Sequence, residues 1–306
     1  MFGLGPHKMP ILFLSTLPRS SSLGVADLFY RGAQTDGSPV ILTGHLHLAA
    51  ELSGSGVGQY HSPLHLYNAR EALIRGLMML HQMPASIDSY ESIIKYYFNS
   101  PDSILDINRF CSTLEASVPL LIDPSFSHAM HTSLFRNLPE LGVESRLLIL
   151  WRNPIGFSLD LMQGVYGFDS CLQWILASSL LSFPLDPLML WLEYVKANLQ
   201  LIHHPPSALR HILHVPRENL SLETVSDLCR QLSIKYRPEL RQSTLGESVS
   251  IFSECPYSGD PSYAIDANTP QHLQISFEEL SRFSSQEGIV RDVADYAKII
   301  GYNIID

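Results

Sequence analysis

The sequence predicts an α/β fold in which helices cover both faces of a central parallel sheet. Short apolar runs, typical of buried strands, alternate along the chain with helix-like stretches. Of the 306 residues, 45% are hydrophobic and 16% are charged, as expected of one large globular domain. No apolar stretch reaches the roughly 18 residues that a membrane-spanning helix needs. We therefore expect a single domain over residues 1–306, without a membrane partner.

The elements of this fold follow from apolar patterning. Strands are expected at Ile11–Ser15, Val40–Thr43, Pro119–Ile122, Arg146–Trp151 and His211–Val215. Helices are expected at Ser22–Tyr30, Asn68–Gln82, Ser86–Phe98, Ser103–Leu114, Pro154–Gly164 and Asp186–Ile202. The helices within residues 68–115 form a helical insertion. Residues 237–270, rich in Ser, Pro, Gly and Asp, are expected to form a mobile loop.

Charge and cysteine usage exclude several classes of protein. The net charge of -10 argues against a general nucleic-acid surface, although a local site for a small anion remains possible. The four cysteines lie far apart without a Cys-x-x-Cys pair, so we expect a protein of the reducing cytoplasm. His45 with His47, and His61 with His65, have spacings that metal ligands use, but no His-Glu-x-x-His pattern accompanies them. We expect no metal site.

The first strand leads into Pro18-Arg19 and the serines Ser20, Ser21 and Ser22. In open α/β sheets, ligands bind beyond the carboxyl ends of the strands, where a helix N-terminus presents backbone N–H groups. The serines add hydroxyl donors, and Arg19 adds a permanent cation. This loop therefore predicts a site for a phosphate- or sulfate-like group. The alternative is a serine-capped helix with Arg19 on the surface.

A second strand also ends in an arginine, in the stretch of residues 146–161. Arg152 follows this strand, and Pro154 is well placed as the first residue of a helix. Ser158 then lies about one turn inside the helix, where it could converge with Arg152 on a second anion. The alternative is an ordinary strand-turn-helix, since Asn-Pro turns are common.

Together these stretches resemble the sulfotransferase superfamily, whose members use 3′-phosphoadenylyl sulfate (PAPS). The run from Pro18 to Ser22 is similar to the 5′-phosphosulfate loop of the family, except that Ser21 stands where the family has glycine. Arg152 and Ser158 keep the spacing of the 3′-phosphate motif. Residues 120–127 and 212–234 resemble the family's middle strand and its late strand and helix. Because it lacks this glycine and departs from the family pattern elsewhere, the chain resembles a divergent, bacterial-type member of the family.

The resemblance implies a P-loop-like three-layer fold with a central parallel sheet, and it also implies sulfotransferase activity. Arg19 and Ser20 to Ser22 would contact the 5′-phosphosulfate, and Arg152 with Ser158 would hold the 3′-phosphate. The sulfuryl group would pass from PAPS to a hydroxyl of a small-molecule acceptor, such as a secondary metabolite, leaving PAP. No metal is required in this family.

Sulfuryl transfer needs charge stabilisation and a base near the acceptor. Arg19 would neutralise charge on the bridging oxygen. His45 aligns best with the position of the base in some bacterial relatives, and histidine titrates near neutrality. His47 and Asp123 are the next candidates for the base. Alternatively, the histidines are structural or line the acceptor pocket.

Two rival functions and one open assignment remain at this point. A P-loop kinase shares the strand-loop-helix arrangement, but residues 15–22 contain neither glycine nor lysine. A non-catalytic binding protein that kept the fold is the other rival. Tyr96, Tyr97, Phe98 and Trp191 either line the acceptor pocket or belong to the core, as aromatics at helical spacing usually do.

Overall fold

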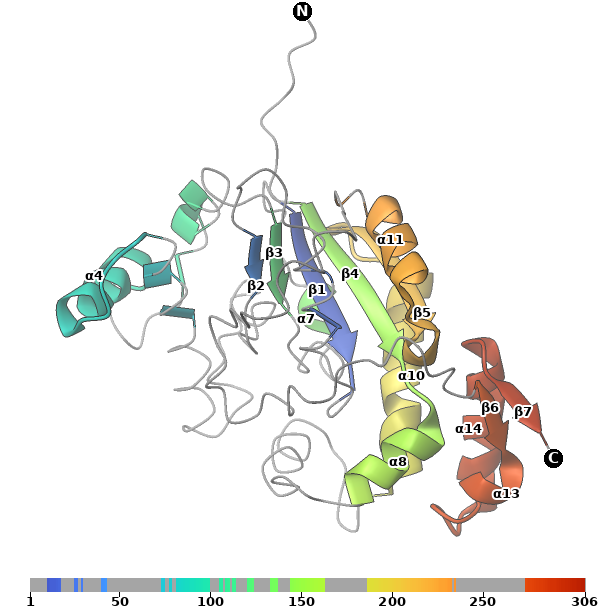
Figure 1. Ribbon diagram of the computed structural model, residues 1–306. Coiled ribbons are helices and arrows are strands. Elements are labelled where there is room, and N and C mark those ends of the chain that lie inside the picture. The colour runs from blue at the N-terminus through green and yellow to red at the C-terminus, as the bar shows by residue number, and fades with distance from the viewer. Residues whose placement is uncertain are drawn as a thin grey trace, which may run out of the picture.

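The computed structural model describes most of the predicted sheet and its surrounding helices (Figure 1). The described residues are 10–17, 25–26, 29, 40–42, 73–74, 77–78, 81–99, 105–106, 108–110, 112–113, 120–123, 133–136, 144–162, 186–232, 234 and 273–305. The expected loop at 237–270 lies outside them.

All of the expected strands are present and form one parallel sheet. The strands are β1 (Pro10–Thr16), β2 (Val40–Leu42), β3 (Leu120–Asp123), β4 (Glu144–Trp151) and β5 (Leu209–Pro216). Within the described residues they form a five-stranded sheet in the order β2-β3-β1-β4-β5, and every neighbouring pair is parallel. The prediction of a central parallel sheet is therefore confirmed.

Strand β1 shows why continuous apolar runs in the sequence predicted these strands. The side chains of Ile11, Leu12, Phe13 and Leu14 are all 0% exposed. Ile11 and Phe13 pack in one core, whereas Leu12 and Leu14 pack in a second core on the other face. A parallel strand covered on both faces has no side for polar residues, so its sequence does not alternate.

Helices cover both faces of the sheet, which gives the expected three layers. Helix α10 (Pro187–His203) contributes Leu190, Trp191 and Val195 to one core. Helix α11 (Leu222–Gln231) contributes Val225 and Cys229 to the other, beside the helical residues at 25, 26 and 29. Figure 1 shows α10 behind the sheet and α11 in front of it.

The helix boundaries follow the capping signals of the sequence. Helix α10 begins with Pro187 after its N-cap Asp186, whose carboxylate accepts hydrogen bonds from the amides of Leu188 and Met189. Helix α4 (Ile87–Tyr97) follows the N-cap Ser86 in the helical insertion. Helix α8 (Pro154–Met162) begins with proline as predicted. No helix in the described ranges is long and apolar enough to cross a bilayer.

Several elements were not expected from the sequence. They are α7 (Ser133–Arg136), the 3-10 turn η2 (Arg217–Asn219), β6 (Gln274–Ser276), α13 (Phe277–Leu280), α14 (Glu287–Ile299) and β7 (Asn303–Ile305). Strands β6 and β7 form a separate parallel pair, in which Ile275 is aligned with Ile304. Helix α14 packs on α10, and Ser284 donates a hydrogen bond to Asp186 at 2.5 Å. The C-terminal segment 273–305 is thus fixed to the beginning of α10.

Candidate functional site

The sheet topology places the candidate site at the carboxyl ends of β1 and β4. The chain leaves β1 toward β2 on one side of the sheet, and it leaves β4 toward β5 on the other side. Such a reversal between neighbouring strands is where ligands bind in open α/β sheets. Thr16 of β1 is aligned with Leu150 of β4, so both strands end at the same edge. The turn that carries Arg152 begins there, beyond Trp151.

The structure describes only some of the predicted site residues. Arg19, Ser20 to Ser22, His45 and His47 lie outside the described residues, so the predictions about them stay predictions. Asp123, Arg152 and Ser158 are described, and their side chains are 0%, 7% and 0% exposed. These three are the part of the predicted site whose surroundings are known.

The turn after β4 is closed by the cap of helix α8. The Asn153 side-chain oxygen Oδ1 accepts hydrogen bonds from the amides of Ile155 at 2.9 Å and Gly156 at 3.4 Å. The carbonyl of Asn153 accepts a bond from the amide of Phe157 at 2.9 Å. Pro154 has no N–H to offer. The first amides of α8 are therefore engaged by Asn153, and an anion at this turn would be held by the Arg152 side chain rather than by these amides.

Two tryptophans fix the main chain around Arg152. Trp191 of α10 donates its indole N–H to the carbonyl oxygen of Arg152 at 2.7 Å. Trp151 donates its own indole N–H to Nδ1 of His214 on β5, at 3.1 Å. Burial lowers the pKa of His214, which favours the neutral ring that this bond requires. Trp191, a candidate for the acceptor pocket, is instead a core residue of the Arg152 turn.

A carboxylate and a tyrosine hold the other side of the same turn. Glu218 Oε1, in η2, accepts a hydrogen bond from the amide of Asn153 at 2.9 Å. Its second oxygen, Oε2, accepts a bond from the hydroxyl of Tyr302 at 2.6 Å. Burial and the neighbouring Glu218 carboxylate raise the pKa of Tyr302 well above its ordinary value, so the hydroxyl keeps its proton. Sequence reasoning did not find this pair.

Ser158 lies one turn inside α8, as predicted, but its hydroxyl is hydrogen-bonded to the backbone of α8 itself. Ser158 Oγ donates a hydrogen bond to the carbonyl of Pro154 at 2.7 Å. This bond is the usual way in which a serine within a helix satisfies its proton. To donate to a phosphate beside Arg152, the Ser158 hydroxyl would have to give up this bond. The predicted convergence of Arg152 and Ser158 therefore stays a prediction.

Polar groups at the end of β1 complete the described edge. Ser15 Oγ donates to Asn198 Oδ1 of α10 at 2.9 Å. The hydroxyl of Tyr194 lies 3.1 Å from the carbonyl oxygen of Ser15 and 2.8 Å from that of Leu150, so it links β1 to β4. Thr16 Oγ1 is buried and has no hydrogen-bond partner among the residues that the structure describes. A buried hydroxyl left unpaired at this edge fits a site that a polar ligand completes.

Asp123, one candidate for the base, ends β3 at this edge of the sheet. It is aligned with Phe13 in the parallel register, so it lies on the face that α10 covers. Its side chain is 0% exposed. A base must reach the acceptor hydroxyl, so a completely buried Asp123 could serve only if the acceptor entered beside β3.

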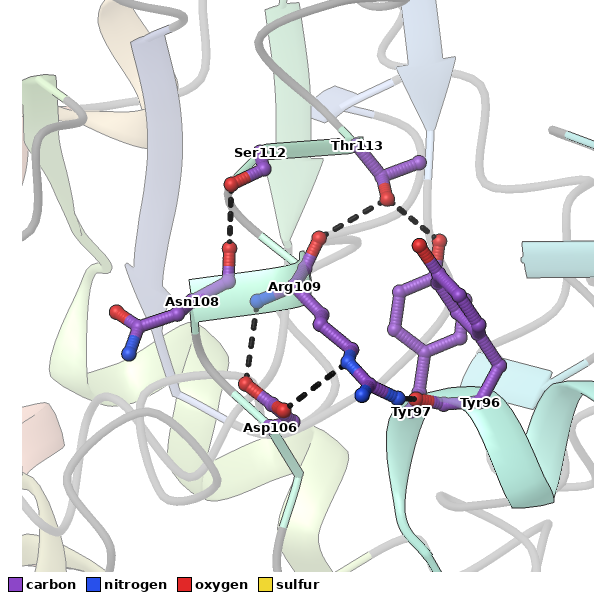
Figure 2. A network of polar contacts seen from close by, with 7 residues as sticks. All are labelled: Tyr96, Tyr97, Asp106, Asn108, Arg109, Ser112 and Thr113. Carbon is purple, nitrogen blue, oxygen red and sulfur yellow. Dashed lines mark hydrogen bonds and ion pairs between the residues drawn. The ribbon is translucent and has the colours of Figure 1, made fainter.

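The helical insertion is joined internally by a network of polar contacts (Figure 2). Tyr97 of α4 donates its hydroxyl proton to Thr113 Oγ1 at 2.8 Å, and Thr113 donates to the carbonyl of Arg109 at 2.9 Å. Arg109 forms an ion pair with Asp106 at 3.4 Å and donates to the carbonyl of Tyr96 at 2.6 Å.

The aromatic residues of the insertion divide between the core and the surface. Tyr97 and Phe98 are 0% exposed and belong to the core. Tyr96 is 49% exposed, and the guanidinium of Arg109 lies over its ring at 5.0 Å from the centroid. Of the aromatic residues considered for the acceptor pocket, Tyr96 alone is exposed.

Comparison with known proteins gives the fold a name. No protein-family model matches the sequence, and a search of curated proteins found no match. Two solved structures match over nearly the whole chain. A sulfotransferase domain from the Synechococcus PCC 7002 olefin synthase has a TM-score of 0.63 at 17% identity, covering 98% of this chain and 98% of that domain. A sulfotransferase domain from the curacin biosynthetic pathway has a TM-score of 0.61 at 17% identity, covering 97% of this chain and 99% of that domain.

These likenesses establish the fold. The chain has the three-layer α/β fold of sulfotransferase domains, so the resemblance seen in the sequence is confirmed at the level of the fold. In the part of the chain that the structure describes, no group of three or more His, Cys, Asp or Glu side chains could hold a metal ion.

Proposed function

We propose that this protein is a sulfotransferase that moves the sulfuryl group of PAPS to a hydroxyl of a small-molecule acceptor. The observation that carries the proposal is Arg152, a buried cation at the end of β4 in a sheet with the sulfotransferase-domain fold. The guanidinium of an arginine presents a planar fork of N–H donors that suits a phosphate. We assign Arg152, with Ser158, to the 3′-phosphate of the donor.

The remaining donor contacts follow from the family resemblance of the loop after β1. Arg19 and the backbone and hydroxyls of Ser20 to Ser22 would bind the 5′-phosphosulfate. This loop follows Thr16, whose buried hydroxyl has no partner within the described part of the chain, and Thr16 is aligned with Leu150 two residues before Arg152. The two halves of the donor site thus begin at neighbouring strands. This neighbourhood supports one ligand that spans both.

In the proposed reaction the acceptor oxygen attacks the sulfur of PAPS. The bond between sulfur and the bridging oxygen breaks, and its electron pair stays on the 5′-phosphate of the departing PAP. Arg19 would stabilise the charge that develops on this oxygen. The acceptor proton would pass to a base, for which we propose His45, with His47 and then Asp123 as alternatives.

The acceptor is proposed to be a secondary metabolite. The two solved domains reported above come from an olefin synthase and from the curacin biosynthetic pathway, which supports a role in the biosynthesis of small molecules. The net charge of -10 disfavours a sulfated polymer as acceptor, because such a chain needs a basic track.

The first test is calorimetric titration of PAP, ADP and Mg-ATP into the wild type and Arg152→Ala. We expect tight binding of PAP without metal and weaker binding of ADP. Arg152→Ala should weaken PAP binding by about tenfold or more, since a charge-assisted contact is lost. Arg230→Ala is the matched control, because Arg230 lies in the last turn of α11 with its side chain 75% exposed.

Other outcomes of this titration would indicate a different function or a different position of the 3′-phosphate. Preference for Mg-ATP would contradict the proposal and favour a P-loop kinase. If none of the three nucleotides binds, the result would favour a non-catalytic binding protein that has kept the fold. PAP binding that survives Arg152→Ala would leave the donor in place but move its 3′-phosphate away from Arg152.

A further inference from the structure

We infer that Glu218 and Tyr302 are positioning residues for Arg152, so that the C-terminal segment 273–305 sets the affinity of the site for the 3′-phosphate. The inference rests on the proposed function and adds to it a role for residues far from the donor loops in sequence. It concerns how the turn after β4 is held, and it assigns neither residue a contact with the ligand.

The contacts form a continuous chain from the C-terminal segment to the turn. Tyr302 donates its hydroxyl to Glu218 Oε2 at 2.6 Å, and Glu218 Oε1 accepts from the amide of Asn153 at 2.9 Å. Asn153 directly follows Arg152, and its side chain caps α8. Removing the carboxylate would therefore release a backbone N–H beside Arg152, and removing the tyrosine hydroxyl would release the carboxylate.

The fold brings these residues together from separate parts of the chain. Strands β4 and β5 run in parallel with Trp151 aligned to Pro216, so the turns that follow them lie side by side. Glu218 is in the turn after β5, opposite Asn153 in the turn after β4. Residue Gly301 ends α14 with φ +102, a conformation that favours glycine, and a side chain there would meet Pro216 Cγ at 3.8 Å. This glycine turns the chain so that Tyr302 reaches Glu218.

Burial makes this chain of contacts stiff. Tyr302 is 2% exposed, and its amide donates to the carbonyl of Ala297 at 2.9 Å. The charge of Arg152 partly opposes the rise in the pKa of Tyr302 that burial and Glu218 cause, which places the guanidinium within electrostatic reach of the hydroxyl. Trp191 holds the Arg152 carbonyl from α10. The main chain of the turn is thus fixed from two sides, by α10 and by the C-terminal segment.

Fixing the turn should affect one part of the ligand only. A cation held in one place loses little freedom when it binds a phosphate, whereas a turn that moves must be ordered first. The quantity affected is the contribution of the 3′-phosphate to the binding free energy. PAP carries this phosphate, and adenosine 5′-monophosphate (AMP) lacks it. The ratio of the two affinities therefore reports on the Arg152 turn, and a general loss of structure would weaken both ligands alike.

The test measures PAP and AMP binding by calorimetry for the wild type, Tyr302→Phe, Glu218→Ala and Glu218→Gln. We expect Tyr302→Phe to lower the PAP to AMP affinity ratio about threefold and Glu218→Ala about tenfold. Glu218→Gln should restore most of the ratio, because its amide oxygen still accepts from the Asn153 amide and its NH₂ group faces the tyrosine oxygen. Tyr296→Phe, a partly buried tyrosine of α14 that lies near Lys196, is the matched control.

A second measurement follows hydrogen exchange of the Asn153 amide without ligand. Exchange should be faster in Glu218→Ala and Tyr302→Phe than in the wild type and Tyr296→Phe. A PAP preference that persists unchanged in both variants, or unchanged exchange at Asn153, would overturn the inference while leaving the proposed function standing. A wild type that does not prefer PAP to AMP would overturn the proposed function itself.

Discussion

Two polar networks of this protein differ in how they are protected from water. Behind the sheet, Ser15, Tyr194 and Asn198 are all 0% exposed and form neutral hydrogen bonds that link α10 to β1 and β4. In the helical insertion, Arg109 and Asp106 form an ion pair whose side chains are 46% and 31% exposed. The first network lies under the candidate donor site, and the second joins α4 to the segment 106–113 (Figure 2).

The difference indicates which region is built to stay fixed. Buried neutral hydrogen bonds are costly to break, because each leaves an unpaired polar group in a low dielectric. Exposed ion pairs contribute little and weaken with salt. The edge of β1 and β4 is therefore held firmly, which suits the donor site proposed there. In the insertion, the ion pair between Arg109 and Asp106 can be reached by water and contributes less.

The largest effect is expected when the buried network is broken at Asn198. Asn198→Leu keeps the approximate shape of the side chain, but it leaves the hydroxyl of Ser15 without its acceptor and removes the side-chain donor to the carbonyl of Tyr194. We expect a loss of about 2–3 kcal/mol in the free energy of unfolding. Chemical denaturation of the purified variant measures this loss.

A double variant provides the control for Asn198. Ser15→Ala removes the stranded hydroxyl, so the double variant Ser15→Ala/Asn198→Leu should be more stable than the sum of the single losses predicts. Strictly additive losses would mean that Ser15 and Asn198 do not depend on each other, contrary to the 2.9 Å hydrogen bond between them.

The next effect concerns Tyr194 at alkaline pH. Complete burial raises the pKa of Tyr194 far above its ordinary value of 10.0, so the folded protein keeps the phenol protonated. The unfolded chain releases this proton above pH 10, and the stability that Tyr194 contributes is therefore lost as the pH rises beyond that point. The free energy of unfolding should fall with pH more steeply in the wild type than in Tyr194→Phe, by up to about 1.4 kcal/mol per pH unit.

Tyr96→Phe is the control from the other network, because the Tyr96 side chain is 49% exposed. Its slope above pH 10 should equal that of the wild type. Equal slopes for the wild type and Tyr194→Phe would show instead that the Tyr194 hydroxyl ionises in the folded state.

The insertion should give a smaller effect that depends on salt. Arg109→Ala removes the ion pair with Asp106 and the contact of the guanidinium with the Tyr96 ring. We expect a loss of about 1 kcal/mol at low ionic strength, shrinking in about 1 M NaCl. PAP affinity should stay unchanged. A loss as large as that of Asn198→Leu, or one insensitive to salt, would contradict the contrast between the two networks.

Much of this architecture could be predicted, because local patterns determine it. The strands were found as apolar runs, and the start of α8 was found from Pro154, since both signals lie within a few neighbouring residues. The arginine at the end of β4 was identified for the same reason. The hydrogen-bond partner of the Ser158 hydroxyl was harder to predict, because the choice between a ligand and the carbonyl of Pro154 depends on the surroundings of the helix.

The positioning pair could not be found from local patterns. Glu218 and Tyr302 are 84 positions apart, and the sequence contains no signal for where α14 docks. The repeated apolar residues of the stretch 287–299, among them Val290, Val293 and Ala297, would have predicted α14 as an amphipathic helix. The packing of that helix on α10, and so the reach of Tyr302 to Glu218, depends on tertiary contacts between segments far apart in the sequence.

The smallest effect is expected at His214 of β5, whose ring accepts a hydrogen bond from Trp151. Its Nδ1 accepts the indole N–H of Trp151, and a protonated ring cannot accept at this atom. Because burial lowers the pKa of His214, the unfolded chain takes up the proton first as the pH falls below 6.5. The stability contribution of this bond is present above pH 6.5 and is lost below it. Solvent screening at this exposed side chain keeps the loss below about 0.5 kcal/mol.

His214→Leu separates this effect from other titrations. The variant should be slightly less stable than the wild type at pH 7.5, and the difference should shrink as the pH falls below 6.5. Trp151→Phe should abolish the same pH dependence, since it removes the donor of the bond. Because Trp151 directly precedes Arg152, the wild type should also lose more PAP affinity than His214→Leu over this pH range. A difference in stability that persists unchanged at pH 5.5 would mean that His214 contributes packing alone, and that the Arg152 turn is held from α10 and the C-terminal segment without help from β5.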